Sequence, residues 1–422
     1  MQTGKKFSVF EHQTITLHQT IGDVMIDEDL LQALQNYYGA NGVPYYSLIY
    51  KGVRFNEYVG VLQVGTTTIE VLPKADKILS NTSDVQTWRG ILLGMVKAIG
   101  TFDVQSTGES NLRIHPNSLL HLYFELFVKE VEYLIHAGLV KKYRKKEGNV
   151  TSLKGNLLFS KHIQQNLIHQ ERFYVRHTTY DTEHLLHSIL YKTLQLLHRI
   201  NTFSSLQSRI GSLLLSFPEM QDFRVTDATF DHITYNHKTQ SYQRAIDIAK
   251  LLLLNYHPDV VKGRNNVLAL MFDMNVLWEK FVAVSLRKAF NTTEQPSKYF
   301  WKHANGSRVQ MRPDIVLNID DNEHCIVLDT KWKNLNGYNP SPEDLRQMFV
   351  YHEYFGAKRV ALLYPGAMNT PVKGTFYPSI SSTEQNPREC GILSIAVQSN
   401  IKEWQTAICS ICKNWMEGSL GV

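Results

Sequence analysis

The sequence predicts a multidomain α+β protein with three parts. Strand-like runs are prominent in residues 1–105, helical periodicity dominates residues 106–265, and residues 266–422 alternate both patterns. These ranges are the predicted domains: a β-containing N-terminal domain, a mainly helical middle region and a C-terminal α/β domain. The chain has 422 residues, of which 43% are hydrophobic. Such a composition excludes a disordered tail protein and a disulfide-stapled miniprotein.

Composition also predicts a soluble cytoplasmic protein without a membrane partner. Four cysteines in so long a chain suit a reducing compartment, and no run approaches the ~20 apolar residues of a membrane span. The chain has 44 Lys and Arg residues against 39 Asp and Glu residues. This small basic excess permits nucleic-acid binding without requiring it.

The clearest N-terminal signals are a hairpin and a helix. Residues 59–64 and 69–72 form strand-like runs on either side of Gly65-Thr66-Thr67, and Pro73 ends the second run. Residues 84–99 then carry apolar side chains at helical spacing, which predicts a helix.

Helical periodicity and one basic run characterise the middle of the chain. The periodicity predicts helices over residues 119–137, 182–199, 245–255 and 271–289. The run Lys141–Lys146 follows the first of these helices and holds five cations around Tyr143. Such a run could contact DNA phosphates or a protein partner, or it could be the solvated end of a helix.

The C-terminal part alternates strands and helices. Two β-runs, residues 308–319 and 323–333, are joined by the turn-forming cluster Asp320-Asp321-Asn322. A helix follows, with Ser341 as its N-cap and Pro342 at its first position. Later segments predict strands at residues 358–365 and 391–398 and a final helix at residues 401–416.

Two acids and a lysine fall on the predicted hairpin. Asp314 lies in its first strand, and Asp329 and Lys331 share one face of its second strand. A tight turn between the strands brings the two carboxylates close together, and converging carboxylates repel unless a cation lies between them. Oxygen ligands favour Mg²⁺ or Mn²⁺. A nearby lysine would orient water or stabilise charge on a phosphate.

The segments "RPD" and "VLDTK" resemble the PD-(D/E)xK nuclease motif. The helix after the motif carries Gln347, a residue type typical of the branch that includes RecB-like nucleases. The helix before it carries Glu279, where that branch often places an extra acid. Simpler readings stay open at this point: a solvated pair on an edge strand for Asp329 and Lys331, a turn cap for Asp314, and surface positions for the other two.

Several segments, in order, are similar to McrC proteins, the nuclease subunit of McrBC-type modification-dependent restriction systems. The resemblance covers residues 58–354 and rests on "YVGVLQVGTTTIEVLPKAD", "LVKKYRKKEGNVTSLKGNLLFSKHI", "FDMNVLWEKFV", "RPDIVL", "LDTKWK" and "DLRQMFVYHEYF". It implies a Mg²⁺-dependent DNA endonuclease subunit, with Mn²⁺ as an alternative metal. The implied metal ligands are Asp314, Asp329, the backbone carbonyl of Thr330 and Glu279. Lys331 would position water, and Gln347 would orient the site or contact DNA.

The resemblance also implies partners. No G-x-x-x-x-G-K-[ST] motif occurs, so this chain should not hydrolyse nucleotide by itself. A McrB-like AAA+ GTPase hexamer would bind GTP and recognise 5-methylcytosine, and the N-terminal part, residues 1 to about 170, would dock on it and stimulate its hydrolysis. Cutting both strands of DNA would require a second copy of this chain. The alternatives are a stand-alone PD-(D/E)xK repair nuclease and a non-catalytic adaptor of an AAA+ partner.

Overall fold

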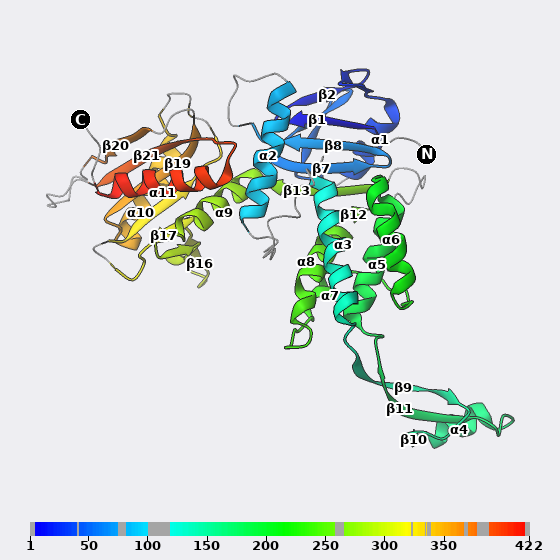
Figure 1. Cartoon of the computed structure of the whole chain (residues 1–422). Coiled ribbons are helices and arrows are strands. Elements are labelled where there is room, and N and C mark those ends of the chain that lie inside the picture. Colours follow the sequence, from blue (N-terminus) through cyan, green and yellow to red (C-terminus); the bar gives the residue numbers. More distant parts are fainter. Residues whose placement is uncertain are drawn as a thin grey trace. The chain divides into compact units, whose positions relative to one another are not determined.

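The computed structural model describes residues 5–39, 42–74, 82–99, 119–257, 266–321, 324–333, 335, 339–366, 370–377 and 388–417 (Figure 1). These residues form two compact units. Unit 1 contains the 63–67 turn and the described residues from 119 to 270. Unit 2 contains the other described N-terminal residues and those from 271 onward. Residues of the first and third predicted domains therefore share unit 2, and the predicted domain boundaries stay a prediction.

The N-terminal portion of unit 2 is built around short sheets. Strand β1 (Lys6–Phe10) pairs in parallel with β8 (Thr67–Leu72), which neighbours β7 (Tyr58–Val64), so the predicted hairpin is confirmed. A second sheet has the order β2 (Thr14–Thr16), β6 (Gly52–Phe55), β5 (Tyr46–Ile49), and β3 (Thr20–Ile21) pairs with β4 (Val24–Met25). The helices here are α1 (Glu28–Tyr38) and α2 (Thr82–Ala98), the second of which confirms the predicted helix over residues 84–99.

The C-terminal portion of unit 2 has a six-stranded mixed sheet. Its order is β14 (Thr292–Glu294), β17 (Ile315–Leu317), β18 (Ile326–Thr330), β19 (Arg359–Gly366), β21 (Glu389–Ala396), β20 (Thr370–Thr375). β17 and β18 form the predicted antiparallel pair, whereas β18, β19 and β21 run parallel. The helices of this portion are α9 (Met274–Leu286), α10 (Pro342–Phe355) and α11 (Ile401–Glu417).

Helix α10 covers one face of the six-stranded sheet. Its Met348, Tyr351 and Phe355 belong to a buried cluster with Val316 of β17 and Val327 of β18. Ser341 caps the helix as predicted, because its side chain accepts a hydrogen bond from the N–H of Asp344 at 3.1 Å. Helices α9 and α11 contact each other and are joined by the stacked rings of Trp278 and Trp404.

Two predicted boundaries in this region are wrong. The helix predicted over residues 271–289 begins only at Met274, because the preceding residues belong to strand β13 (Val267–Asp273) and Asp273 caps the helix with its side chain. The first predicted β-run splits into β16 (Arg308–Met311) and β17, with Pro313 between them. β16 pairs instead with β15 (Lys298–Lys302) in a separate two-stranded ribbon. Proline has no N–H for a ladder, which explains the break.

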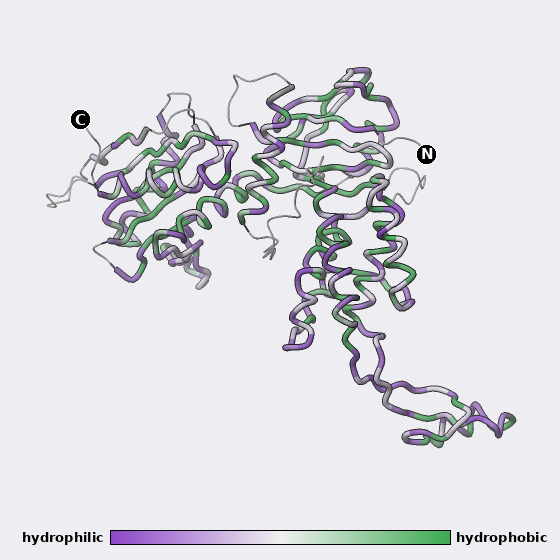
Figure 2. Tube along the Cα trace, in the orientation of Figure 1, coloured by the Kyte–Doolittle hydropathy of each residue, from purple (hydrophilic) through white to green (hydrophobic). Residues whose placement is uncertain are grey.

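Unit 1 is mainly helical, as predicted for the middle of the chain. Its helices are α3 (Leu119–Ala137), α4 (Phe159–Asn166), α5 (Leu185–Ile200), α6 (Ser204–Ser216), α7 (Asp227–Asp231), the 3₁₀ turn η1 (Gln240–Tyr242) and α8 (Gln243–Leu254). The predicted helices 119–137, 182–199 and 245–255 are confirmed as α3, α5 and α8. Strand β12 (Tyr256–His257) pairs with the start of β13. Figure 2 shows apolar residues concentrated along the longer helices and the sheets.

A long β-ribbon interrupts the helices of unit 1. Strand β9 (Lys142–Val150) pairs with β11 (Phe173–Asp181), which also pairs with β10 (Asn156–Leu157). The basic run therefore lies mainly in a strand and is not the end of a helix. Figure 1 shows this ribbon extending from the helices of its own unit. Among the described helices, none has the length and apolarity needed to cross a bilayer.

Candidate active site

Strand β18 and the residue after it supply the first two side chains of the site. Asp329 is 1% exposed and shares its strand face with Val327, which packs in the core beneath α10. Lys331 lies on the same face, and its Nζ is 2.8 Å from Oδ2 of Asp329. The backbone N–H of Lys331 donates to the Leu363 carbonyl of β19 at 2.9 Å, which ties this residue to the sheet.

Asp314 reaches the same end of the sheet from the residue just before β17. Its Oδ2 accepts hydrogen bonds from the N–H and the hydroxyl of Thr330, at 2.6 and 2.8 Å. The charge of Asp314 also raises the pKa of Asp329, after the larger effect of burial. The structure thus brings together the two aspartates on which the motif depends, although Asp314 precedes its strand and does not lie within it.

Gln347 joins the site from helix α10. Nζ of Lys331 donates to Oε1 of Gln347 at 3.4 Å, and Nε2 of Gln347 donates to the hydroxyl of Tyr351 at 2.7 Å. The Tyr351 hydroxyl in turn donates to the Arg312 carbonyl at 3.0 Å. Sequence reasoning missed Tyr351, which lies one helical turn after Gln347 on the same side of α10.

Glu279 approaches from helix α9. It is 9% exposed, and its Oε1 accepts a hydrogen bond from Nε2 of Gln295 at 2.9 Å. The backbone N–H of Gln295 donates to the Asp314 carbonyl at 2.9 Å, while its φ of 46° places it in the left-handed region. Gln295 therefore connects Glu279 to Asp314. No sequence motif identified Gln295, because its role depends on an unusual backbone conformation.

Burial of like charges dominates the electrostatics of the site. Burial, helped by the charges of Asp314 and Asp329, raises the pKa of Glu279 to about 7. The pKa of Asp329 is raised to about 7, chiefly by burial. Burial also raises the pKa of Asp314, although the hydrogen bonds from Thr330 oppose this effect. Burial opposes the charge of Lys331, but the attraction of Asp329, together with that of Asp314 and Asp344, raises the lysine pKa.

The donor set fits a hard divalent cation. The charges of Asp314 and Asp329 both act on Glu279, and Lys331 forms an ion pair with Asp329. Oδ2 of Asp329 is buried and has this ion pair but no well-directed hydrogen bond within the described residues. A cation would relieve this excess of negative charge, and all the donors are oxygens. Within the described ranges, no three His, Cys, Asp or Glu side chains are spaced to hold a metal by themselves. Backbone oxygen and water would therefore complete the coordination of a metal held by the aspartates.

The residues just after Lys331 anchor this end of the strand. Nε1 of Trp332 donates to Oε1 of Glu11 at 2.9 Å, and the N–H of Lys74 donates to the same oxygen at 2.6 Å. Nζ of Lys333 lies 2.7 Å from Oδ2 of Asp344 on α10. The site is therefore fixed on one side by the end of β1 and on another by α10, and neither link could be read from the sequence.

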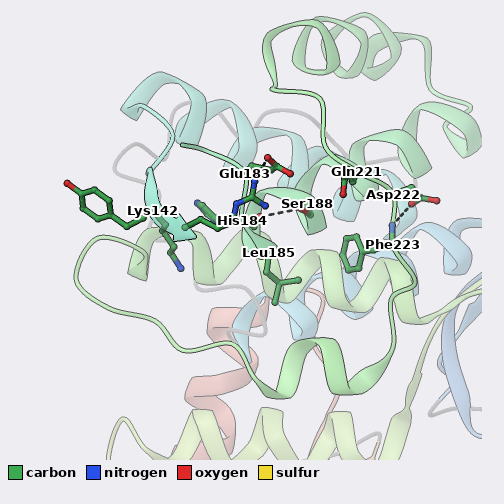
Figure 3. Close-up of a pocket in the computed structure, with 10 residues that line it drawn as sticks. Lys142, Glu183, His184, Leu185, Ser188, Gln221, Asp222 and Phe223 are labelled. Carbon is green, nitrogen blue, oxygen red and sulfur yellow. Dashed lines mark hydrogen bonds and ion pairs between the residues drawn. The ribbon is translucent and has the colours of Figure 1, made fainter. Parts of the chain in front are cut away.

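A separate pocket lies at the base of the β-ribbon in unit 1. It has a volume of about 460 Å³, and Figure 3 shows Lys142, Glu183, His184 and Asp222 among its lining residues. Arg144 and Lys146 of the basic run pair with Glu183, the latter at 2.8 Å. Both cations also pair with Asp181, so two acids compensate these two cations of the run.

Comparison with known proteins places these observations in a family. The model of the McrBC 5-methylcytosine restriction system component family matches residues 53–365, a range that contains every candidate site residue. The chain belongs to this family. The resemblance indicated by the sequence motifs is confirmed at this level. Among curated proteins, nothing matches.

Solved structures extend the comparison for this family member. A chain from the refined half-complex of the tetradecameric assembly of Thermococcus gammatolerans McrB AAA+ hexamers with bound McrC has a TM-score of 0.68 and 18% identity. The match covers 97% of this chain and 100% of that one. It shows the fold and confirms the mixed α+β architecture with several sheets. The cryo-EM structure of the Thermococcus gammatolerans McrBC complex matches with a TM-score of 0.48 and 19% identity, covering 67% of this chain and 88% of that one.

Proposed function

We propose that the protein is the metal-dependent DNA endonuclease subunit of a 5-methylcytosine-dependent restriction system, with a PD-(D/E)xK site. One observation carries the proposal: Asp314, Asp329 and Lys331 meet at one end of the sheet with an excess of buried negative charge. Family membership supports the biological setting, because the matching family is a component of McrBC restriction systems.

The metal ligands in this proposal are Asp314, Asp329 and the carbonyl of Thr330, with Glu279 as an additional acid. The metal is Mg²⁺, or Mn²⁺ as a substitute, since all the donors are oxygens. When bound, such a cation activates water and offsets phosphate charge. Gln295 holds the carboxyl of Glu279 by a hydrogen bond, and the charges of the two aspartates help to raise the pKa of Glu279.

Lys331 is the proposed residue for orienting water and stabilising charge on the phosphate. Asp329 keeps it protonated, and Gln347 accepts a second contact from Nζ. Gln347 is itself fixed by Tyr351, so the ammonium group is held from two elements, β18 and α10. A preorganised cation of this kind stabilises developing charge without reorganising during the reaction.

The proposal includes a motor partner. It is a McrB-like AAA+ hexamer that binds GTP and recognises modified cytosine, while this chain stimulates its hydrolysis and cuts DNA. The lack of a P-loop motif in this chain supports the division of labour. The similar fold of a chain solved with McrB AAA+ hexamers is compatible with it. One site per chain means that two copies act on the two DNA strands.

Plasmid cleavage tests the proposal. Methylated and unmethylated plasmids are incubated with Mg²⁺ and the full chain, with and without the AAA+ protein and GTP. Only methylated plasmid with partner and GTP should be cut. Asp329→Asn should lower the rate at least ~100-fold while preserving stimulation of GTP hydrolysis. Asp320→Asn, an exposed aspartate in the β17–β18 connection, is the matched control and should cut as the parent does.

Other outcomes point to the two alternatives. Cutting without partner or GTP, still abolished by Asp329→Asn, would indicate a stand-alone repair nuclease. Cutting by the whole system that survives Asp329→Asn would indicate a non-catalytic adaptor, because the chemistry would then lie in another chain.

A further inference from the structure

A two-stranded ribbon leads directly into the candidate active site. Strands β15 and β16 pair only with each other in the described structure, apart from the six-stranded sheet. Met311 ends the ribbon three residues before Asp314, so the two Cα atoms lie within ~11 Å. The carbonyl of Arg312, between them, accepts the hydrogen bond from Tyr351 that also supports Gln347. The ribbon and the site therefore share one hydrogen-bonded support.

Large aromatic side chains of the ribbon are open to solvent. Tyr299, Phe300 and Trp301 are 56%, 42% and 50% exposed, and Val309 on the opposite strand is also exposed. Single exposed apolar residues are common, but three exposed aromatics in a row place apolar surface on both faces of the ribbon, and such surface marks contacts with a partner.

The ribbon carries cations and no acid. Residues 298–313 include Lys298, Lys302, Arg308 and Arg312 but neither Asp nor Glu. Lys302 stands directly opposite Arg308 in the strand register, and both residues are exposed. Like charges in directly opposite positions destabilise a strand pair. An anionic ligand would remove this cost, whereas an uncharged partner would not.

A bulge brings Tyr299 and the two opposed cations to one face of the ribbon, whereas Trp301 lies on the other face with Val309. The register shifts between Tyr299 and Trp301, which leaves Phe300 as the extra residue and reverses the alternation beyond it. Arg308, opposite Lys302, also lies over the Tyr299 ring at 5.3 Å. An aromatic ring and two cations consequently share the same side of the ribbon.

The ribbon is preformed. In its turn, the N–H of His303 donates to the Ser307 carbonyl at 2.8 Å, and Gly306 adopts a φ of 91° that favours glycine. At its base, Met311 is buried in the core and Nζ of Lys298 lies 4.7 Å from the ring of Phe355. A ligand would thus meet an ordered surface and would not bear the entropy of ordering a loop.

We propose that the β15–β16 ribbon is a DNA-contacting element of the nuclease site. Its cations bind phosphates beside the scissile bond, and the Tyr299 ring on the same face packs against sugars and bases. Four or five residues per strand span ~15 Å, which matches about four base pairs. This inference rests on the proposed function. DNA is favoured over a protein partner because this face combines an aromatic ring with two cations that pair with no acid in the described part of the chain.

Equilibrium binding tests the ribbon without requiring cleavage. Anisotropy of a fluorescent 30-base-pair duplex is measured with the full chain, without divalent metal, from 50 to 200 mM KCl. The Lys302→Ser/Arg308→Ser double variant should weaken binding ~10-fold or more. It should also make the negative slope of log K against log salt shallower by ~1.8, because two phosphate contacts are lost. Tyr299→Ala, on the same face as the two cations, should weaken binding by about 10-fold with little change of slope.

Matched controls exclude general effects of charge and exposure. Lys413→Ser removes an exposed lysine of α11, and Tyr377→Ala removes an aromatic side chain that is 96% exposed. Both should bind DNA as the parent does, and tryptophan fluorescence verifies that every variant is folded. Ribbon variants that keep the parental affinity and salt slope would overturn the inference. Unchanged DNA affinity with lost binding of the AAA+ protein would also overturn it and assign the ribbon to a protein contact.

The two proposals can fail separately. Asp329→Asn should bind the duplex no more weakly than the parent, since its carboxylate repels DNA. If ribbon variants lose affinity but no condition yields Asp329-dependent cutting, the nuclease proposal fails and the DNA-contacting ribbon stands. If cutting depends on Asp329 but ribbon variants bind and cut like the parent, only the ribbon inference fails.

Discussion

The buried carboxyl of Glu11 should make the stability of unit 2 depend on pH. Glu11 is 6% exposed, and its Oε1 accepts hydrogen bonds from the Lys74 N–H and from Trp332, whereas its Oε2 has no hydrogen-bond partner in the described part of the chain. Burial raises the pKa of Glu11 to about 7, despite these hydrogen bonds. We expect Glu11→Gln to weaken the pH dependence, because an amide keeps the acceptor but cannot ionise.

The sign and size follow from the pKa values of the folded and unfolded states. The folded protein holds the Glu11 proton more tightly, so this contribution to stability is full below pH 4.5 and is lost as the pH rises through about 7. Between pH 5 and pH 8 the loss amounts to ~2.5 kcal/mol, at 1.36 kcal/mol per pKa unit. In a domain of this size, that corresponds to a melting-temperature difference of ~5–10 °C.

Tryptophan fluorescence is a selective assay for this effect, because all six tryptophans of the chain lie in unit 2. Melting curves of the parent and of Glu11→Gln are compared at pH 5, 6, 7 and 8. The parent should lose more stability than the variant on going from pH 5 to pH 8, and the variant should be the more stable protein at pH 8. Parallel pH profiles of the two proteins would refute the reasoning, since Glu11 would then titrate normally in the folded state.

Three further substitutions test packing and pairing. Ser341→Ala should destabilise unit 2 by ~1 kcal/mol through loss of the α10 cap, measured by urea denaturation; an unchanged midpoint would contradict the role of the cap. Gly391→Ala would place a Cβ 2.6 Å from Nε1 of Trp415, so a loss of ~1–3 kcal/mol and altered tryptophan emission are expected, and a neutral effect would be contrary evidence. Arg209→Ala removes the closest cation of the buried Glu125 carboxylate and should cost ~3 kcal/mol in unit 1, followed by far-ultraviolet circular dichroism; parental melting would argue against the pair.

Local patterns predicted those elements whose signals are contained in short stretches of chain. The hairpin around Gly65 combines alternation with a turn residue of φ 55°, and α10 begins at Ser341 as its capping signals require. The start of α9 was predicted wrongly because buried strand and buried helix residues look alike over a few positions. Asp273, a helix cap just after a β-run, was the available signal of the boundary.

The spacing of residues along the chain predicts the two aspartates and the lysine of the candidate site. It does not predict the residues that hold them in place. Strand alternation and a short turn were sufficient to predict that Asp314, Asp329 and Lys331 converge. Sequence reasoning did not identify Tyr351, Gln295 or Glu11. Each of them acts through a contact with a residue far away in sequence or through an unusual backbone angle.

The sequence by itself determined the α+β class, the family and the acidic pair with its lysine, because local periodicity and motif spacing are enough to predict these features. Only the tertiary structure decided that residues at the N-terminal end of the chain and those from 271 onward share one compact unit, that the β-run before Asp314 divides, and that its first half becomes an exposed cationic ribbon. Such decisions depend on which distant segments pack together, and long-range packing leaves no periodic trace in a single sequence.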